Sequence, residues 1–199
     1  MSVRKKCLVL TALCLLICAG ALGLRVRLEQ RALAERLIRL HVVAASDAPA
    51  DQARKLLVRD ALLPRIAALT ADCPDADSAA RALEAGLPAL EESAARTLGA
   101  GEAVTAALAW ESFPRRDYPG FSLPAGTYRA LRVTLGAGRG HNWWCVAFPA
   151  LCLPASEEEL REEAAQAGLS EDEITLMTEE SDTVRFKFRL LDWLAELFY

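Results

Sequence analysis

Residues 136–154, GAGRGHNWWCVAFPALCLP, decide the fold more than any other stretch of this chain. Three of the first five residues are glycines, which allow backbone geometry that side chains forbid. If the segment after them is a strand, Trp143 and Trp144 point to opposite faces. One tryptophan is then exposed or covered by a partner, unless both faces of the sheet are buried. Cys145 and Cys152 are close enough to be bridged, and pairing them would leave Cys73 free.

Alternating apolar residues predict the strands of a sheet. Ile38, Leu40 and Val42 alternate with Arg39, His41 and Val43, the pattern of a half-buried strand. The same period of two recurs in three later segments, residues 104–110, 128–135 and 142–148. Between the first two of these, residues 113–126 are rich in proline, glycine and aromatic residues. They predict a long loop, of the kind that often carries recognition.

Two helices are predicted between the first strand and the later ones. Ser46 or Asp47 can cap the first helix, Pro49 suits its first turn, and Pro64 should kink or split it. Capping also explains Asp47 and Asp51 more simply than a metal site or an acid–base pair does. The second helix should begin near Asp75 and end at Gly99-Ala100-Gly101.

The C-terminal part of the chain is predicted to form smaller elements. Residues 157–182 are strongly acidic and contain enough Leu, Ala and Ile for one or two short helices. Residues 184–189 alternate like a half-buried strand. Residues 190–199, LLDWLAELFY, form a short amphipathic helix, for which packing on the chain's own sheet is favoured over a membrane surface.

The N-terminus predicts export. Arg4, Lys5 and Lys6 precede an uncharged apolar run from Leu8 to Leu24, the pattern of a secretory signal peptide or of a short membrane anchor. Lipidation at Cys14 or Cys18 is disfavoured, because a large residue precedes each. We therefore expect residues 1–24 to be a signal peptide or anchor, residues 25–35 a spacer, and residues 36–199 a single exported domain.

Charge argues against nucleic acid as a partner. The whole chain carries a formal net charge of −4. Removal of the first 24 residues deletes three basic groups and no acidic one, which leaves about −7. Phosphate binding needs a basic surface, so no nucleic acid is expected.

The sequence lacks the motifs of common enzymes. It contains two histidines and no HExxH, GxSxG or Walker pattern. The GAGRG stretch at residues 136–140 precedes a predicted strand, whereas a dinucleotide loop precedes a helix. We expect no catalytic residues, no cofactor and no metal. A plain structural protein of the cell envelope remains a weaker alternative.

The enzymatic alternative is a secreted cysteine-dependent enzyme with Cys145 as nucleophile and His141 as base. Four positions along a strand correspond to about 13 Å, too far for a hydrogen bond unless the glycine turn folds back. A disulfide with Cys152 would also consume the nucleophile. The other histidine, His41, alternates with apolar residues beside Arg39, so a solvated or rim position is expected for it.

Three segments resemble stage II sporulation protein R of endospore-forming bacteria. They are RLHVVAASDAPADQARKLLVRDA from Arg39, LPAGTYRALRVTLGAGRGHNWWCVAFPALC from Leu123, and VRFKFRLLDWL from Val184. The resemblance runs from about Arg36 to Leu194. Its most specific part is NWWCVxFPxLC, Asn142 to Cys152, and its second marker is SDxxxDQxxKxxVRD, Ser46 to Asp60.

The resemblance implies a signalling protein that is not an enzyme. Such a protein is made in the forespore and exported into the space between the forespore and mother-cell membranes. There it activates a membrane-embedded aspartic protease, which removes the pro-sequence of the mother-cell sigma factor, sigma-E. The implied partners are the outward-facing part of that protease and, if the N-terminal segment is not cleaved, the membrane.

We therefore predict an α+β domain in which a mixed or antiparallel sheet is covered on one face by the two helices after Ser46. The partner would be contacted through residues 136–152 and the loop 113–126. The candidate contact or structural residues are Gly136, Gly138, Gly140, Asn142, Trp143, Trp144, Cys145, Pro149 and Cys152, with Cys145 and Cys152 as the candidate disulfide.

Overall fold

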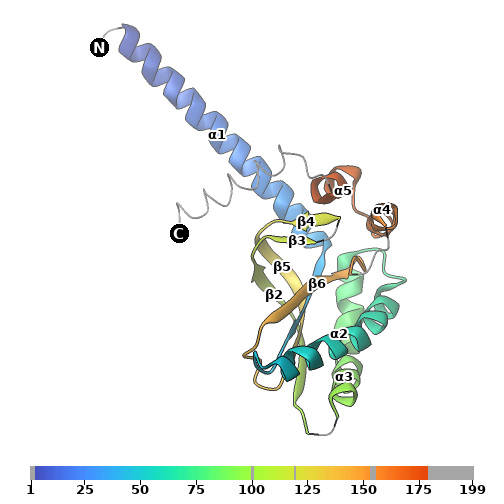
Figure 1. Ribbon diagram of the computed structural model, residues 1–199. Helices are drawn as coiled ribbons and strands as arrows, with labels where there is room; N and C mark the ends of the chain where they lie inside the picture. Colours follow the sequence, from blue (N-terminus) through green and yellow to red (C-terminus); the bar gives the residue numbers. More distant parts are fainter. Residues whose placement is uncertain (1–2, 100, 119, 153–155, 179–199) are drawn as a thin grey trace. The chain divides into compact units, whose positions relative to one another are not determined.

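A computed structural model describes residues 3–99, 101–118, 120–152 and 156–178 (Figure 1). The elements follow in the order α1 (Val3–Arg36), β1 (Ile38–Val43), α2 (Pro49–Thr70), α3 (Ala76–Leu98), β2 (Val104–Phe113), β3 (Arg116–Tyr118), β4 (Phe121–Leu123), β5 (Gly126–Leu135), β6 (Asn142–Phe148), α4 (Glu157–Gln166) and α5 (Glu171–Thr178). The strand and helix predicted within residues 184–199 lie outside the described residues.

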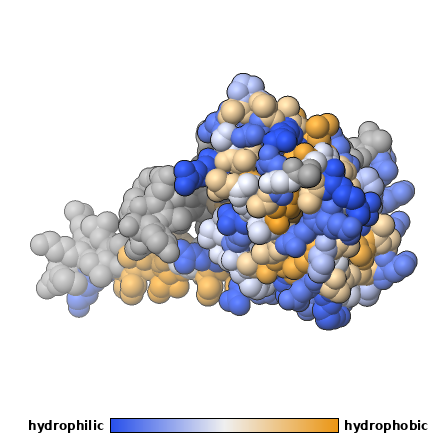
Figure 2. Space-filling model, turned by 90° about the horizontal axis from the view of Figure 1, so that it is seen from below, coloured by the Kyte–Doolittle hydropathy of each residue, from blue (hydrophilic) through white to orange (hydrophobic). Residues whose placement is uncertain are grey.

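The described residues divide into two compact units, one containing residues 3–32 and the other residues 33–178. The first unit is the greater part of α1, which carries exposed leucines such as Leu10 and Leu16. Figure 2 shows hydrophobic residues, coloured orange, on the surface of the chain. The spacer expected at residues 25–35 is helical and continuous with it. No helix among the described residues has the length and apolar character that crossing a membrane requires.

The second unit is built on a mixed four-stranded sheet in the order β2-β5-β1-β6. β1 runs parallel to β5, while β6 is antiparallel to β1 and β2 is antiparallel to β5. A parallel pair needs a crossover connection, and the chain from α2 through α3, β2, β3 and β4 provides it. The expected mixed sheet and α+β class are confirmed.

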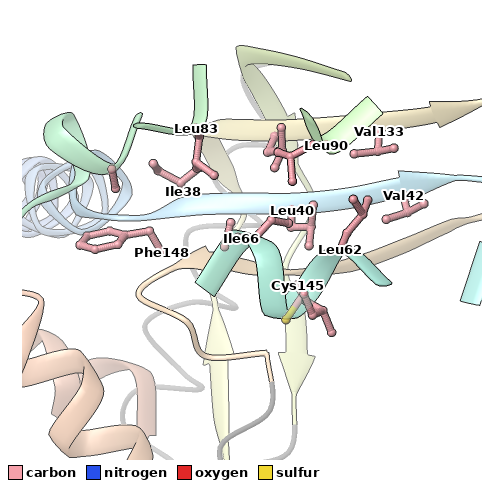
Figure 3. Close-up of a cluster of buried hydrophobic side chains, with 14 of the residues drawn as sticks. Ile38, Leu40, Val42, Leu62, Ile66, Leu83, Leu90, Val133, Cys145 and Phe148 are labelled. Atoms are coloured by element: carbon pink, nitrogen blue, oxygen red, sulfur yellow. The ribbon is translucent and has the colours of Figure 1, made fainter. Parts of the chain in front are cut away.

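The first face of the sheet packs against α2 and α3. Ile38, Leu40 and Val42 of β1 meet Leu62 of α2 and Leu83 of α3 in a fully buried cluster (Figure 3). The helix residues lie on one stripe of each helix, as the 3.6-residue period dictates. The prediction that two helices cover one face is therefore confirmed.

The second face of the sheet is covered as well, which the sequence did not predict. The cluster there joins the end of α1, the β3–β4 hairpin, α4 and α5 to the sheet. All six residues of β1 are buried in consequence, so the prediction of a half-buried strand was wrong. The segment 113–126 is likewise not an irregular loop throughout, because it contains the hairpin.

The starts of the two helices after β1 differ from each other. The start of α3 near Asp75 is as expected, and Asp75 itself caps the helix, accepting the backbone N–H of Ser78 at 2.7 Å in a capping box. The cap of α2 is Ala48, without a side-chain hydrogen bond, followed by Pro49. Capping by Ser46 or Asp47 was thus a wrong prediction. Pro64 does not split α2, which continues through it.

Candidate functional site

The glycine turn between β5 and β6 lies against the loop that follows β1. Gly138 has φ of 61°, in the left-handed region that favours glycine. Gly140 is required for a different reason, since a Cβ there would lie 2.2 Å from the carbonyl oxygen of Ser46. The Gly140 N–H donates to Ala44 O at 2.9 Å and the Arg139 N–H to Ala45 O at 3.2 Å. The turn is therefore a close backbone-to-backbone contact.

Side chains from the α2 region hold the end of this turn. Asp47 Oδ1 accepts the backbone N–H of His141 at 2.6 Å and also contacts the ring Nδ1 of His141. These hydrogen bonds from His141 lower the pKa of the Asp47 carboxyl. Lys55 Nζ donates to His141 O at 2.9 Å and to Gln52 Oε1 at 2.6 Å, and burial lowers the pKa of this amine.

The two sequence markers of the resemblance are thereby joined in space. Asp47, Gln52 and Lys55 come from the SDxxxDQxxK segment, and His141 directly precedes the NWWC segment. The sequence showed both motifs but gave no sign that one binds the other. Asp47 serves this junction and does not cap a helix.

A disulfide joins Cys145 and Cys152 and ties the middle of β6 to the loop after the strand. The two Cα atoms are 5.6 Å apart, and seven positions separate the residues in sequence. The enclosed loop contains a cis Phe148–Pro149 bond, with Pro149 buried. Cys73 is free and half-buried. The bond fixes the shape of this loop.

Two hollows flank this loop, between α2 and α4. One, of about 270 Å³, is lined by Cys73, Phe148 and Pro149, and the other, of about 220 Å³, by Leu63, Val146 and Cys152 among others. Glu163 of α4 borders both. Burial, and then the nearby Glu159, raises the pKa of its carboxyl.

The adjacent tryptophans lie on opposite faces of β6, and both are half-buried. Trp143 packs on the α2 side, where the guanidinium carbon of Arg59 lies 5.2 Å from its ring centroid. Trp144 packs on the hairpin side, with Arg116 of β3 at 5.2 Å. Asn142, half-buried, opens the strand opposite Val43. Because β6 is an edge strand, both rings flank the same edge of the sheet.

A buried arginine on the second face was missed from the sequence. Arg39 is fully buried; its Nη2 donates to Tyr118 Oη at 2.6 Å and its Nε to Cys145 O at 3.4 Å. Its guanidinium carbon lies 4.5 Å from the ring centroid of Phe113 and 5.0 Å from that of Tyr128. Aromatic faces attract such a cation. Burial lowers the pKa of Arg39.

His41 adjoins this arginine and is also fully buried, so the predicted solvated position was wrong. Its ring stacks on Trp144 with centroids 4.9 Å apart. Its Nε2 lies 3.1 Å from Glu111 Oε2, but without the alignment of a hydrogen bond. Burial, followed by the charges of Arg132 and Arg39, lowers its pKa to about 4. Burial and the two cations disfavour protonation of the ring more than Glu111 favours it, so His41 is neutral at pH 7.

The Cys145–His141 pair of the enzymatic alternative is not assembled. Cys145 is bonded to Cys152, and the His141 ring, 81 % exposed, contacts Asp47. In the described residues no group of three or more His, Cys, Asp or Glu side chains could hold a metal ion.

Comparison with known proteins adds the biological context. The family model of stage II sporulation protein R matches residues 34–158, which contain the sheet, the glycine turn and the disulfide. A stage II sporulation protein R of Bacillus subtilis (strain 168) is 32 % identical over 184 residues, 82 % of this chain and 82 % of that protein. No solved structure matches.

An α+β domain with these matches is a sporulation signalling protein. Both matches span the two most specific segments of the resemblance, NWWCVxFPxLC and SDxxxDQxxK, while the family match ends before the third segment, which begins at Val184. The chain belongs to the stage II sporulation protein R family.

Proposed function

We propose that this protein is an exported signal that activates a membrane-embedded aspartic protease, which then cleaves the pro-form of sigma-E. The observation that carries the proposal is the family match over residues 34–158, which contain the glycine turn, both tryptophans and the disulfide. A protein of this kind acts by contact, so it needs no catalytic group of its own.

The contact surface we propose is the β6 edge, meaning the side chains of Trp143 and Trp144 with the loop closed by the Cys145–Cys152 bond. Tryptophan and arginine dominate the energetics of interfaces, and here each tryptophan carries an arginine on its face. The β3–β4 hairpin adjoins Trp144 through Arg116, so the second segment expected at the interface, residues 113–126, meets the same edge.

Rigidity supports this assignment. The disulfide fixes the loop after β6, and the Asp47 and Lys55 hydrogen bonds fix the turn before it. A surface that is ordered before binding loses less conformational entropy on binding. Activation further requires tighter binding to the active state of the protease than to its inactive state, because a ligand shifts an equilibrium only by that difference.

We propose that residues 1–24 direct export from the forespore into the intermembrane space. The basic residues Arg4, Lys5 and Lys6 followed by an uncharged run to Leu24 support this. The exported domain is then either released by cleavage or held at the membrane by the retained segment.

The test is reconstitution in a non-sporulating bacterium that carries the cognate protease and its pro-sigma substrate. Expression of the full chain should produce the shortened sigma factor on a gel, whereas a version without residues 2–24, retained in the cytoplasm, should not. Cleavage that is equal with and without the exported protein would refute the proposal.

A further inference from the structure

One edge of the sheet is a long strand with a single neighbour. β2 spans ten residues and, in the described part of the chain, pairs only with β5. Edge strands present N–H and C=O groups that can pair with another chain, so proteins usually guard them with charges, prolines or bulges.

β2 lacks those guards over most of its length. Residues 103–110, AVTAALAW, contain no charge and no proline. The register with β5 runs without a shift from Val104 to Phe113. The opposite edge is different. The pairing of β6 with β1 shifts register between Ile38 and Arg39 of β1, and β6 leads directly into Pro149. The two edges of the sheet are thus unequally protected.

A carboxylate occupies one hydrogen-bonding position on the free edge. Glu91 Oε1 of α3 accepts the N–H of Ala106 at 2.7 Å. This amide therefore points away from β5, and Glu91 stands where the carbonyl of an added strand would lie. Alternate residues of a strand point their backbone N–H and C=O groups to the same side, so those of Val104, Leu108 and Trp110 also point away from β5. Trp110 is 52 % exposed beside this edge.

We propose that β2 pairs antiparallel with β2 of a second copy of this chain, with Ala107 on the two-fold axis. This register sets Ala106 opposite Leu108 and Val104 opposite Trp110, so each larger side chain meets a smaller one. The carboxylates at either end, Glu102 and Glu111, fall opposite Ser112 and Ala103. Like charges directly opposite each other would be destabilising, and this register has none. The interface is self-complementary, as a two-fold contact must be.

The pairing supplies the hydrogen bonds that the edge lacks. Ala106 N–H would leave Glu91 and donate to Leu108 C=O of the second copy, with the reciprocal bond in return. Ala107 would face itself in a non-hydrogen-bonded pair, where Cα atoms are about 4.5 Å apart. That distance is within the range of a disulfide. The inference is independent of the proposed function.

Cysteine cross-linking of the full chain tests this register. Cys7, Cys14, Cys18 and Cys73 are first replaced by alanine, and Ala107→Cys, Thr105→Cys or Ala109→Cys is then added. Under mild oxidation Ala107→Cys should form a covalent dimer on a non-reducing gel. Thr105→Cys and Ala109→Cys should not do so alone, but an equimolar mixture of the two should, because residue 105 lies opposite residue 109.

A second pair of variants checks the role of the carboxylate. Glu91→Ala in the Ala107→Cys chain should speed cross-linking several-fold, since it removes the competing acceptor, whereas the neighbouring Glu92→Ala should not. Glu92 pairs with Arg96 instead. Association through the exposed leucines of α1 would cross-link all three cysteine positions alike. Equal cross-linking at all three positions would overturn the proposal. So would the absence of a cross-link at Ala107→Cys in the folded protein, or a cross-link formed by Thr105→Cys alone.

Discussion

Replacement of Gly140 by alanine tests the contact between the glycine turn and the β1–α2 loop. The added Cβ would lie 2.2 Å from Ser46 O, 2.5 Å from Ser46 C and 2.9 Å from Ala44 Cβ. Two of these atoms belong to the backbone, so no side-chain rotation relieves the overlap. The turn must move away from the loop.

The size of the effect follows from what that movement breaks. Overpacking of a tight site costs about 1–3 kcal/mol. The movement also loosens the hydrogen bonds from Gly140 N–H to Ala44 O and from His141 N–H to Asp47 Oδ1, each worth about 1 kcal/mol. We therefore expect Gly140→Ala to lower the free energy of unfolding by about 3–5 kcal/mol, a large share of a typical domain stability of about 5–15 kcal/mol.

Urea unfolding of the purified chain, followed by tryptophan fluorescence, measures this loss. Gly126→Ala is the matched control, because a Cβ there meets only the Tyr128 side chain, with Cε2 the nearest atom at 3.4 Å, an ordinary contact. That variant should be as stable as the parent or more stable by up to about 1 kcal/mol. A Gly140→Ala protein within about 1 kcal/mol of the parent, on that same stability scale, would refute the close contact.

Three further predictions concern the buried groups and the disulfide. Tyr118→Phe should lower the free energy of unfolding by about 1.5–3 kcal/mol, because it leaves a buried donor of Arg39 unpaired; the same change should cost little in an Arg39→Met background, and equal costs would contradict the coupling. Since burial lowers the pKa of His41 to about 4, the unfolded chain binds a proton between pH 6.5 and 4 that the folded chain does not. Stability should therefore fall by up to about 3 kcal/mol as the pH decreases across that window, a loss that His41→Phe should remove in urea titrations at each pH. Replacing Cys145 and Cys152 together by serine should cost about 2–3 kcal/mol for a loop of this length and should reduce sigma-factor processing more than folding; unchanged processing would remove the disulfide from the mechanism.

Local patterns predicted most of the first layer of the fold. Alternation located β1, β2, β5 and β6, and the start of α3 was correctly expected near Asp75. The second layer was not predictable in this way. The short β3 and β4 strands are three residues each, too short for a periodic signal.

The burial of Arg39 and His41 shows why the second layer stayed hidden. A strand that alternates apolar with basic residues normally exposes the basic face to water. Here Phe113, Tyr118 and Trp144, all distant in sequence, supply an aromatic surface that accepts both side chains. Burial of this kind depends on tertiary packing, which strand periodicity does not record.

The candidate site was predictable in its parts but not in its assembly. The paired cysteines, the glycine turn and the two opposed tryptophans were each visible in the sequence. The hydrogen bonds that join Asp47 and Lys55 to His141 were not visible, because 94 positions separate Asp47 from His141. Local sequence spacing does not predict a contact between two residues so far apart in the chain.

The most direct test of the proposed function compares tryptophan variants in the sigma-factor processing assay. Trp143→Ala alters the β6 edge, while Trp110→Ala alters an exposed tryptophan on the other edge of the sheet. With both proteins shown to be folded and exported, we expect Trp143→Ala to lose most processing and Trp110→Ala to retain it. Full processing by a folded Trp143→Ala protein would contradict contact through the β6 edge.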